Sequence, residues 1–143
     1  MKLGIVSDTA GSKVSELVKE LRSFFVHKIN EKYSSIDINI LIAIRCLPET
    51  HFYKSFTRYT KKDNCLVIDI YLKLEDYLKM YKVEQRFHLG NTLIEYLRKA
   101  LEARSFDGLS SEEFIGYIKE LGKETESGDW FCDEIDWSSD LDK

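Results

Sequence analysis

The chain lacks the residues and runs that mark several classes of protein. It has a single proline, Pro48, and seven glycines among 143 residues, which excludes collagen-like and low-complexity sequences. No run approaches the roughly 20 apolar residues that cross a bilayer, and the first residues contain too few apolar side chains for a secretory signal. We therefore expect a cytoplasmic protein that does not associate with a membrane.

Paired cysteines are also missing. Cys46, Cys65 and Cys132 are odd in number and far apart, without CxxC spacing, so neither a zinc site nor a redox pair is indicated. We expect three reduced thiols. Cys46 and Cys65 fall in or beside apolar strands, where a free cysteine packs as a small apolar residue.

Familiar catalytic motifs are absent as well. The sequence contains no GxSxG, HExxH, Walker or GxGxxG pattern, and His27, His51 and His88 are widely separated. The opening segment is similar to the first strand and loop of calcineurin-like phosphoesterases, but Ala10 stands where a metal-binding histidine would be needed. We expect no catalytic residues, no cofactor and no metal site.

The composition that is present suits a folded domain. With 43% hydrophobic and 13% aromatic residues, a chain of this length buries roughly two-thirds of its unfolded surface. We find no internal repeat and no dividing linker, so residues 1–143 are expected to form one domain.

Residues 65–72 predict the central strand of a sheet. Their apolar side chains occupy both faces of a period-two pattern, which is typical of an interior strand. Asp69 alone breaks the pattern. Because an unpaired buried carboxylate costs several kcal/mol, Asp69 needs a partner or must point out past the sheet.

The remaining elements follow from periodicity. We expect strands at residues 2–7, 36–45 and 51–61, with a turn at 61–64 that joins the last of these to the central strand as a hairpin. A helix of about twenty residues begins near Ser12, and a second helical region with a break follows Lys73. A capping box from Ser110 to Glu113 begins the last helix, which Gly122 is placed to end. Gly90 is expected to allow close packing on the sheet.

This order of strand, helix, three strands and helices indicates an α+β fold. We expect an antiparallel four-stranded sheet with helices packed mainly on one face.

Negative charge is concentrated at the end of the chain. Residues 124–143 carry eight acids and one lysine, a net charge of −7, whereas the whole chain carries −4. The basic, aromatic hairpin around Lys61 and Lys62 could in principle contact a nucleic acid, but the overall charge repels a polyanion, so we expect no nucleic-acid binding. Both tryptophans, Trp130 and Trp137, lie in this acidic segment.

Residues 52–59, 66–71 and 89–97, together with the opening strand and helix, resemble small α+β immunity proteins of bacterial polymorphic-toxin systems of the contact-dependent inhibition type. The resemblance covers roughly residues 1–105 and does not reach beyond Gly122. One departure is the pair Ser7-Asp8, where such families often have Ser-x-Glu at the end of the first strand.

The resemblance implies a non-enzymatic inhibitor that binds a cognate toxin domain. A nuclease toxin with a basic cleft would suit the acidic segment, with charge steering association and aromatics anchoring it. The candidate partner-binding residues are Asp129, Trp130, Phe131, Asp133, Glu134, Asp136 and Trp137.

Other readings stay open. The protein could be a regulatory or structural adaptor for another host protein, or, as a third reading, an enzyme whose groups converge from distant positions. The aromatics of the segment could also pack onto the chain's own sheet and hold its end in place. The sequence makes no prediction of oligomeric state.

Overall fold

The computed structural model describes residues 1–9, 12–47, 54–125 and 130–131. Strand, helix, strands and helices follow one another in the predicted order. The elements are β1 (Lys2–Thr9), α1 (Ser12–Lys32), β2 (Asn39–Leu47), β3 (Phe56–Thr60), β4 (Cys65–Lys73), α2 (Leu74–Leu78), α3 (Lys82–Ala103) and α4 (Ser111–Lys123).

The four strands form one sheet in the order β1-β2-β4-β3. β1 pairs with β2 and β2 pairs with β4 in parallel, and only β3 runs antiparallel to its neighbour β4. The expectation of an antiparallel sheet is therefore wrong. For β1 and β2 the physical reason is α1: a helix of 21 residues is about 32 Å long, which matches a strand of eight or nine residues and returns the chain to the end where β1 began. For β2 and β4 the reason is the strand order, because β3 occupies the edge and the hairpin returns the chain as β4 between β2 and β3.

The predicted hairpin between β3 and β4 is confirmed. Asn64 closes its turn with a positive φ of 45°, a conformation that asparagine tolerates, and its backbone N–H donates to the carbonyl of Lys61 at 3.2 Å. β3 is shorter than the predicted strand at 51–61, of which residues 51–53 lie outside the described part. β4 lies between β2 and β3, so the prediction of an interior strand is also confirmed.

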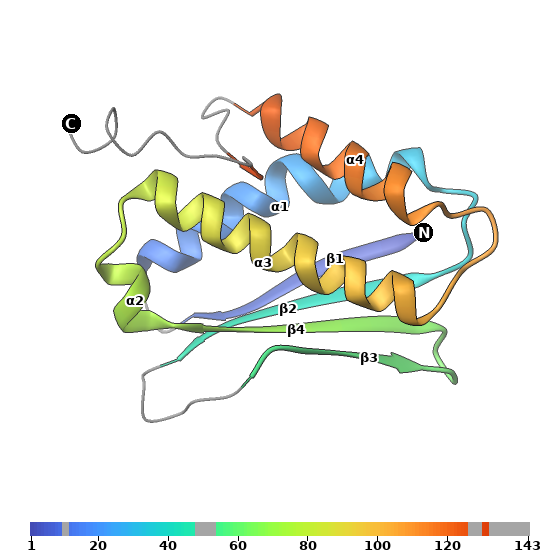
Figure 1. Cartoon of the computed structure of the whole chain (residues 1–143), viewed down its shortest axis with the longest axis horizontal. Coiled ribbons are helices and arrows are strands. Elements are labelled where there is room, and N and C mark those ends of the chain that lie inside the picture. Colours follow the sequence, from blue (N-terminus) through green and yellow to red (C-terminus); the bar gives the residue numbers. More distant parts are fainter. Residues whose placement is uncertain (10–11, 48–53, 126–129, 132–143) are drawn as a thin grey trace.

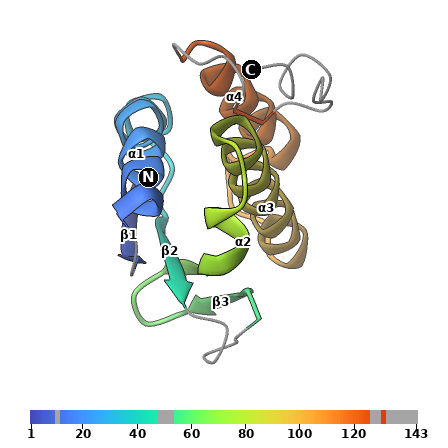
Figure 2. The same cartoon turned by 90° about the vertical axis from the view of Figure 1, so that its left-hand side faces the viewer.

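The helices lie on one side of the sheet (Figures 1 and 2). α1 packs on β1, α3 packs on β4 and β3, and α4 contacts both α1 and α3. The core between the layers consists of side chains that are fully buried: Leu21, Phe25, Ile29, Ile42, Ile44, Ile68, Ile70, Leu89, Leu93, Leu97, Phe114 and Ile118. Each such side chain contributes about 1.5–3 kcal/mol relative to exposure.

The ends of the later helices agree with the sequence except at one glycine. The break predicted within the helical region that follows Lys73 is confirmed, and it separates α2 from α3. The Ser110 hydroxyl accepts a hydrogen bond from the Glu113 N–H at 3.4 Å and caps α4. α4 continues through Gly122 to Lys123, so Gly122 does not end the helix. Among the described helices, none combines the length and the apolar character needed to cross a membrane.

Candidate functional site

The aromatic pair at the start of the acidic segment lies among the helices. Trp130 is fully buried and Phe131 is 3% exposed. The centre of the Phe24 ring of α1 lies 5.4 Å from the centre of the Trp130 ring and 6.3 Å from that of the Phe131 ring. The Trp130 indole N–H donates to Glu20 Oε1 at 2.8 Å, and the same oxygen accepts from Arg86 Nε of α3 at 3.0 Å. A buried indole N–H requires an acceptor, and the Glu20 carboxylate supplies it. Because Arg86 donates to the same oxygen, Glu20 links α1, α3 and the aromatic pair.

Two helical glycines make room for this pair. A methyl group at Gly122 of α4 would lie 2.5 Å from Phe131 Cδ2 and 3.0 Å from the Trp130 carbonyl oxygen, and one at Gly90 of α3 would lie 2.8 Å from Phe131 Cδ1. Carbon atoms do not approach one another so closely without displacement. The close packing predicted for Gly90 is therefore against Phe131 and not against the sheet.

The predicted partner-binding residues fall into two groups. Trp130 and Phe131 pack on the chain's own helices, as in the reading that the aromatics hold the end of the chain, although the contact is with helices and not with the sheet. As they lie, these two rings offer a partner almost no surface. The others lie outside the described residues and stay a prediction: Asp129, Asp133, Glu134, Asp136 and Trp137.

A second candidate surface is the side of the sheet that faces away from the helices. No described helix covers it (Figures 1 and 2). We call it the helix-free face, and strand register assigns the following residues to it: Lys2, Gly4, Val6, Asn39, Leu41, Ala43, Arg45, Phe56, Arg58, Thr60, Cys65, Val67, Asp69, Tyr71 and Lys73.

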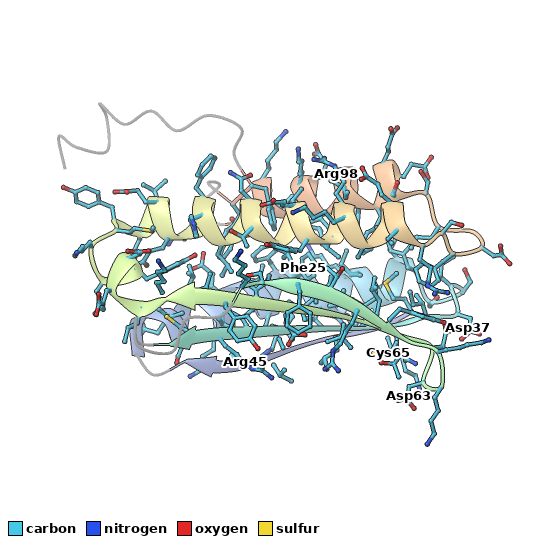
Figure 3. All side chains as sticks on the ribbon, turned by 60° about the horizontal axis from the view of Figure 1, so that its bottom comes forward. Phe25, Asp37, Arg45, Asp63, Cys65 and Arg98 are labelled. Atoms are coloured by element: carbon cyan, nitrogen blue, oxygen red, sulfur yellow. The ribbon has the colours of Figure 1, made fainter. Side chains whose placement is uncertain are left out.

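Asp69 lies at the centre of the helix-free face and is 2% exposed. Its carboxylate oxygens lie 3.6 Å from Arg45 Nη1 and 3.6 Å from Arg58 Nε, so among the described residues the buried charge is balanced by two ion pairs and not by the hydrogen bond that the sequence predicts. Asp69 Oδ2 is nevertheless a buried acceptor without a hydrogen bond from the described residues. Figure 3 shows Arg45 on the side of the sheet away from the helices.

Aromatic and apolar side chains surround these charges. The Arg45 guanidinium donates to the Tyr71 hydroxyl at 2.6 Å and lies 5.5 Å from the centre of that ring. The Phe56 ring is nearly parallel to the Tyr71 ring, at 6.4 Å. Phe56 is 44% exposed and Val6 is 50% exposed. Apolar and basic groups thus lie side by side on this surface.

Sequence reasoning did not assign Arg45 and Arg58 to a site. The sequence offered one signal of this site: the two arginines and Asp69 are charged residues on three separate strands that are otherwise largely apolar. Their convergence depends on β4 lying between β2 and β3, which the pattern of residues alone did not reveal.

The histidines of the described region do not converge. The side chain of His27 on α1 is 86% exposed and lies 3.5 Å from Glu31. On α3, His88 Nδ1 lies 2.7 Å from the Tyr77 hydroxyl, and burial lowers the pKa of His88. His51 lies outside the described residues. Within the described ranges, no group of three or more histidine, cysteine, aspartate or glutamate side chains is arranged to hold a metal ion.

Two of the cysteines pack as the sequence predicts. Cys46 is fully buried, and burial raises the pKa of its thiol to about 11. Cys65 is half-buried, and burial is the main cause that raises its pKa. Since the thiolate is the reactive form, neither environment activates the sulfur. Cys132 lies outside the described residues.

A cavity of about 310 Å³ opens between α1 and the start of α3. Glu20 and Arg86 in its wall bond to each other, and the Gln85 amide donates to the Tyr77 carbonyl oxygen at 2.7 Å. These polar groups therefore connect elements of the fold.

Residues 1–124 match a family model described as Immunity protein 44 (Imm44). The aromatic pair and the rest of the acidic segment after Glu124 lie beyond the matched residues. Neither the curated proteins nor the solved structures contain a match to this chain.

Proposed function

The chain belongs to the Imm44 family of immunity proteins, and we propose that it neutralises its toxin by binding the toxin domain and covering the active cleft. Immunity proteins of bacterial polymorphic toxin systems neutralise a cognate toxin, typically as inhibitors without catalytic activity. The finer proposal concerns how this chain does so and which part of it makes the contact.

The observation that carries the proposal is the net charge of −7 on residues 124–143. Trp130 and Phe131, within this segment, pack among α1, α3 and α4. The acids that follow Phe131 are therefore tethered to a fixed point of the fold, which lowers the entropic cost of presenting them to a partner.

A segment of this charge suits a toxin with a basic cleft. Nuclease toxins need such a cleft because their substrate is a polyanion. We propose that Asp129, Asp133, Glu134 and Asp136 steer and orient the toxin, and that Trp137 is the aromatic anchor of the contact. Trp130 and Phe131 serve to position the segment.

Association kinetics test this assignment. The variant Asp133→Asn/Glu134→Gln/Asp136→Asn should associate with the toxin domain about tenfold more slowly at low salt, and its rate should depend less on ionic strength. Trp137→Ala should instead speed dissociation and cost roughly 2 kcal/mol or more of binding free energy.

A matched control neutralises three exposed acids near the connection between α3 and α4, in the variant Glu102→Gln/Asp107→Asn/Glu112→Gln. This variant should bind as the parent does. If the segment variants, with unchanged melting temperatures, also bind as the parent does, the acidic segment is not part of the interface.

A further inference from the structure

The helix-free face exposes large apolar side chains next to arginines. Four large hydrophobic residues of the described chain are exposed, and two of them, Val6 and Phe56, lie on this face. Aromatic and arginine side chains are the residue types enriched at the energetic centres of protein interfaces. The composition of the face is therefore that of a contact surface.

The helix-free face is basic on an acidic protein. Lys2, Arg45, Arg58 and Lys73 belong to it, whereas its one acid with a described side chain, Asp69, is buried. Asp8 pairs in register with Arg45. Even when the negative charge of Asp8 is counted, the residues assigned to the face carry more positive than negative charges. The chain as a whole carries −4, so the sign of this face is opposite to that of the molecule.

Asp69 holds the two guanidinium groups in place without using up their donors. Both ion pairs measure 3.6 Å, which is longer than the 2.7–3.2 Å of an N–H···O hydrogen bond. A guanidinium carries five N–H donors. The side chains of Arg45 and Arg58 remain 41% and 60% exposed, so donors from two strands can reach one external carboxylate.

We propose that the helix-free face is a second contact surface for the cognate toxin domain, and that the toxin region it receives is acidic and partly apolar. A toxin carboxylate binds between Arg45 and Arg58, and apolar side chains pack on Phe56 and Val6. This inference rests on the proposed function, direct binding of the toxin. It adds a contact whose charge preference is opposite to that of the acidic segment.

Two other occupants fit less well. A second copy of the chain, docked face to face, would bring like charges together. Edge-to-edge pairing through β1 is blocked, because the Asn30 side chain bonds both the N–H and the carbonyl of Leu3, and Arg22 donates to the Ile5 carbonyl. A nucleic acid would be repelled by the net charge of the chain.

Equilibrium titration of full-length variants tests the proposal. The probe is the cognate toxin domain, prepared in a catalytically inactive form. Phe56→Ser and Arg58→Gln should each raise the Kd at least tenfold. The matched controls are Leu78→Ser, at an exposed apolar residue of α2, and Arg98→Gln, whose side chain extends from α3 on the side away from the sheet (Figure 3). Both controls should stay within twofold of the parent.

Phe56→Ser keeps both arginines beside Asp69, so it tests the face even if Arg58→Gln lowers stability. Parent-like binding by folded Phe56→Ser and Arg58→Gln would overturn the proposal while leaving direct toxin binding intact. Self-association of the parent that Phe56→Ser abolishes would instead assign the face to a second copy, and Arg58-dependent binding of duplex DNA would assign it to a nucleic acid. If the parent does not bind the toxin domain at all, the proposed function fails as well.

Discussion

Ile68 and Asp69 are consecutive residues of β4 whose side chains point to opposite sides of the sheet. Ile68 is fully buried beneath the helices, and in register it lies between Ile42 of β2 and Thr57 of β3. Asp69 lies between two arginines on the other side. The alternation of side chains along a strand makes both assignments depend on a single register.

Replacement of Ile68 by aspartate should be among the most damaging single changes. It places an unpaired charge at a site with no exposure, and we expect a loss of about 4 kcal/mol or more of unfolding free energy. Urea denaturation measures the effect. Ile68→Val is the control and should cost about 0.5–1.5 kcal/mol. An aspartate variant that melts within a degree or two of the parent would contradict the assignment of β4 to the centre of the sheet.

The sequence identified the elements more reliably than the way they pair. The hydrophobic periodicity located α1, and the two apolar faces of β4 placed that strand in the interior. The strand directions were missed because α1 was not recognised as a crossover connection from β1 to the parallel strand β2. The nearly continuous apolar run of β4 was a usable signal, since parallel strands are buried on both faces.

The packing of Trp130 and Phe131 against α4 was also beyond the sequence. A glycine near the end of a predicted helix indicates a C-terminal cap, and nothing in the local pattern shows that Phe131 lies against Gly122. The candidate interaction surfaces were predicted in part: the acidic segment is visible in the composition, but the helix-free face depends on strand order.

Because the aromatic pair packs on α4 at Gly122, we expect alanine substitutions at the two glycines of this helix to change stability in opposite directions. Gly122→Ala should lower stability by about 1–3 kcal/mol, because the added methyl group overlaps Phe131. Gly116 of the same helix is exposed and has no atom within 4 Å of an added methyl group, so Gly116→Ala should instead raise stability by up to about 1 kcal/mol.

Thermal and chemical denaturation of the two variants provide the comparison. Adding Phe131→Ala should reduce the further cost of Gly122→Ala, since the overlapping ring is then gone. Equal effects of the two glycine substitutions would show that the segment does not pack on α4 as described.

At the scale of the whole molecule, one layer of helices leaves the two sides of the sheet with different roles. The covered side forms the hydrophobic core, and the other carries the arginines around Asp69. Trp130 and Phe131, which belong to the acidic segment, pack among the helices. The two arginines and the aromatic pair therefore lie on opposite sides of the sheet.

The central claim is that this immunity protein neutralises its toxin by binding and not by chemistry. The most direct test is a titration of toxin activity with the purified protein, at a toxin concentration far above the Kd. Residual activity should fall linearly to zero at one equivalent and should not change with longer incubation. The variant His27→Gln/His51→Gln/His88→Gln should give the same curve. Time-dependent inactivation at far less than one equivalent, lost in a folded triple variant that still binds the toxin, would contradict the claim and identify an enzyme.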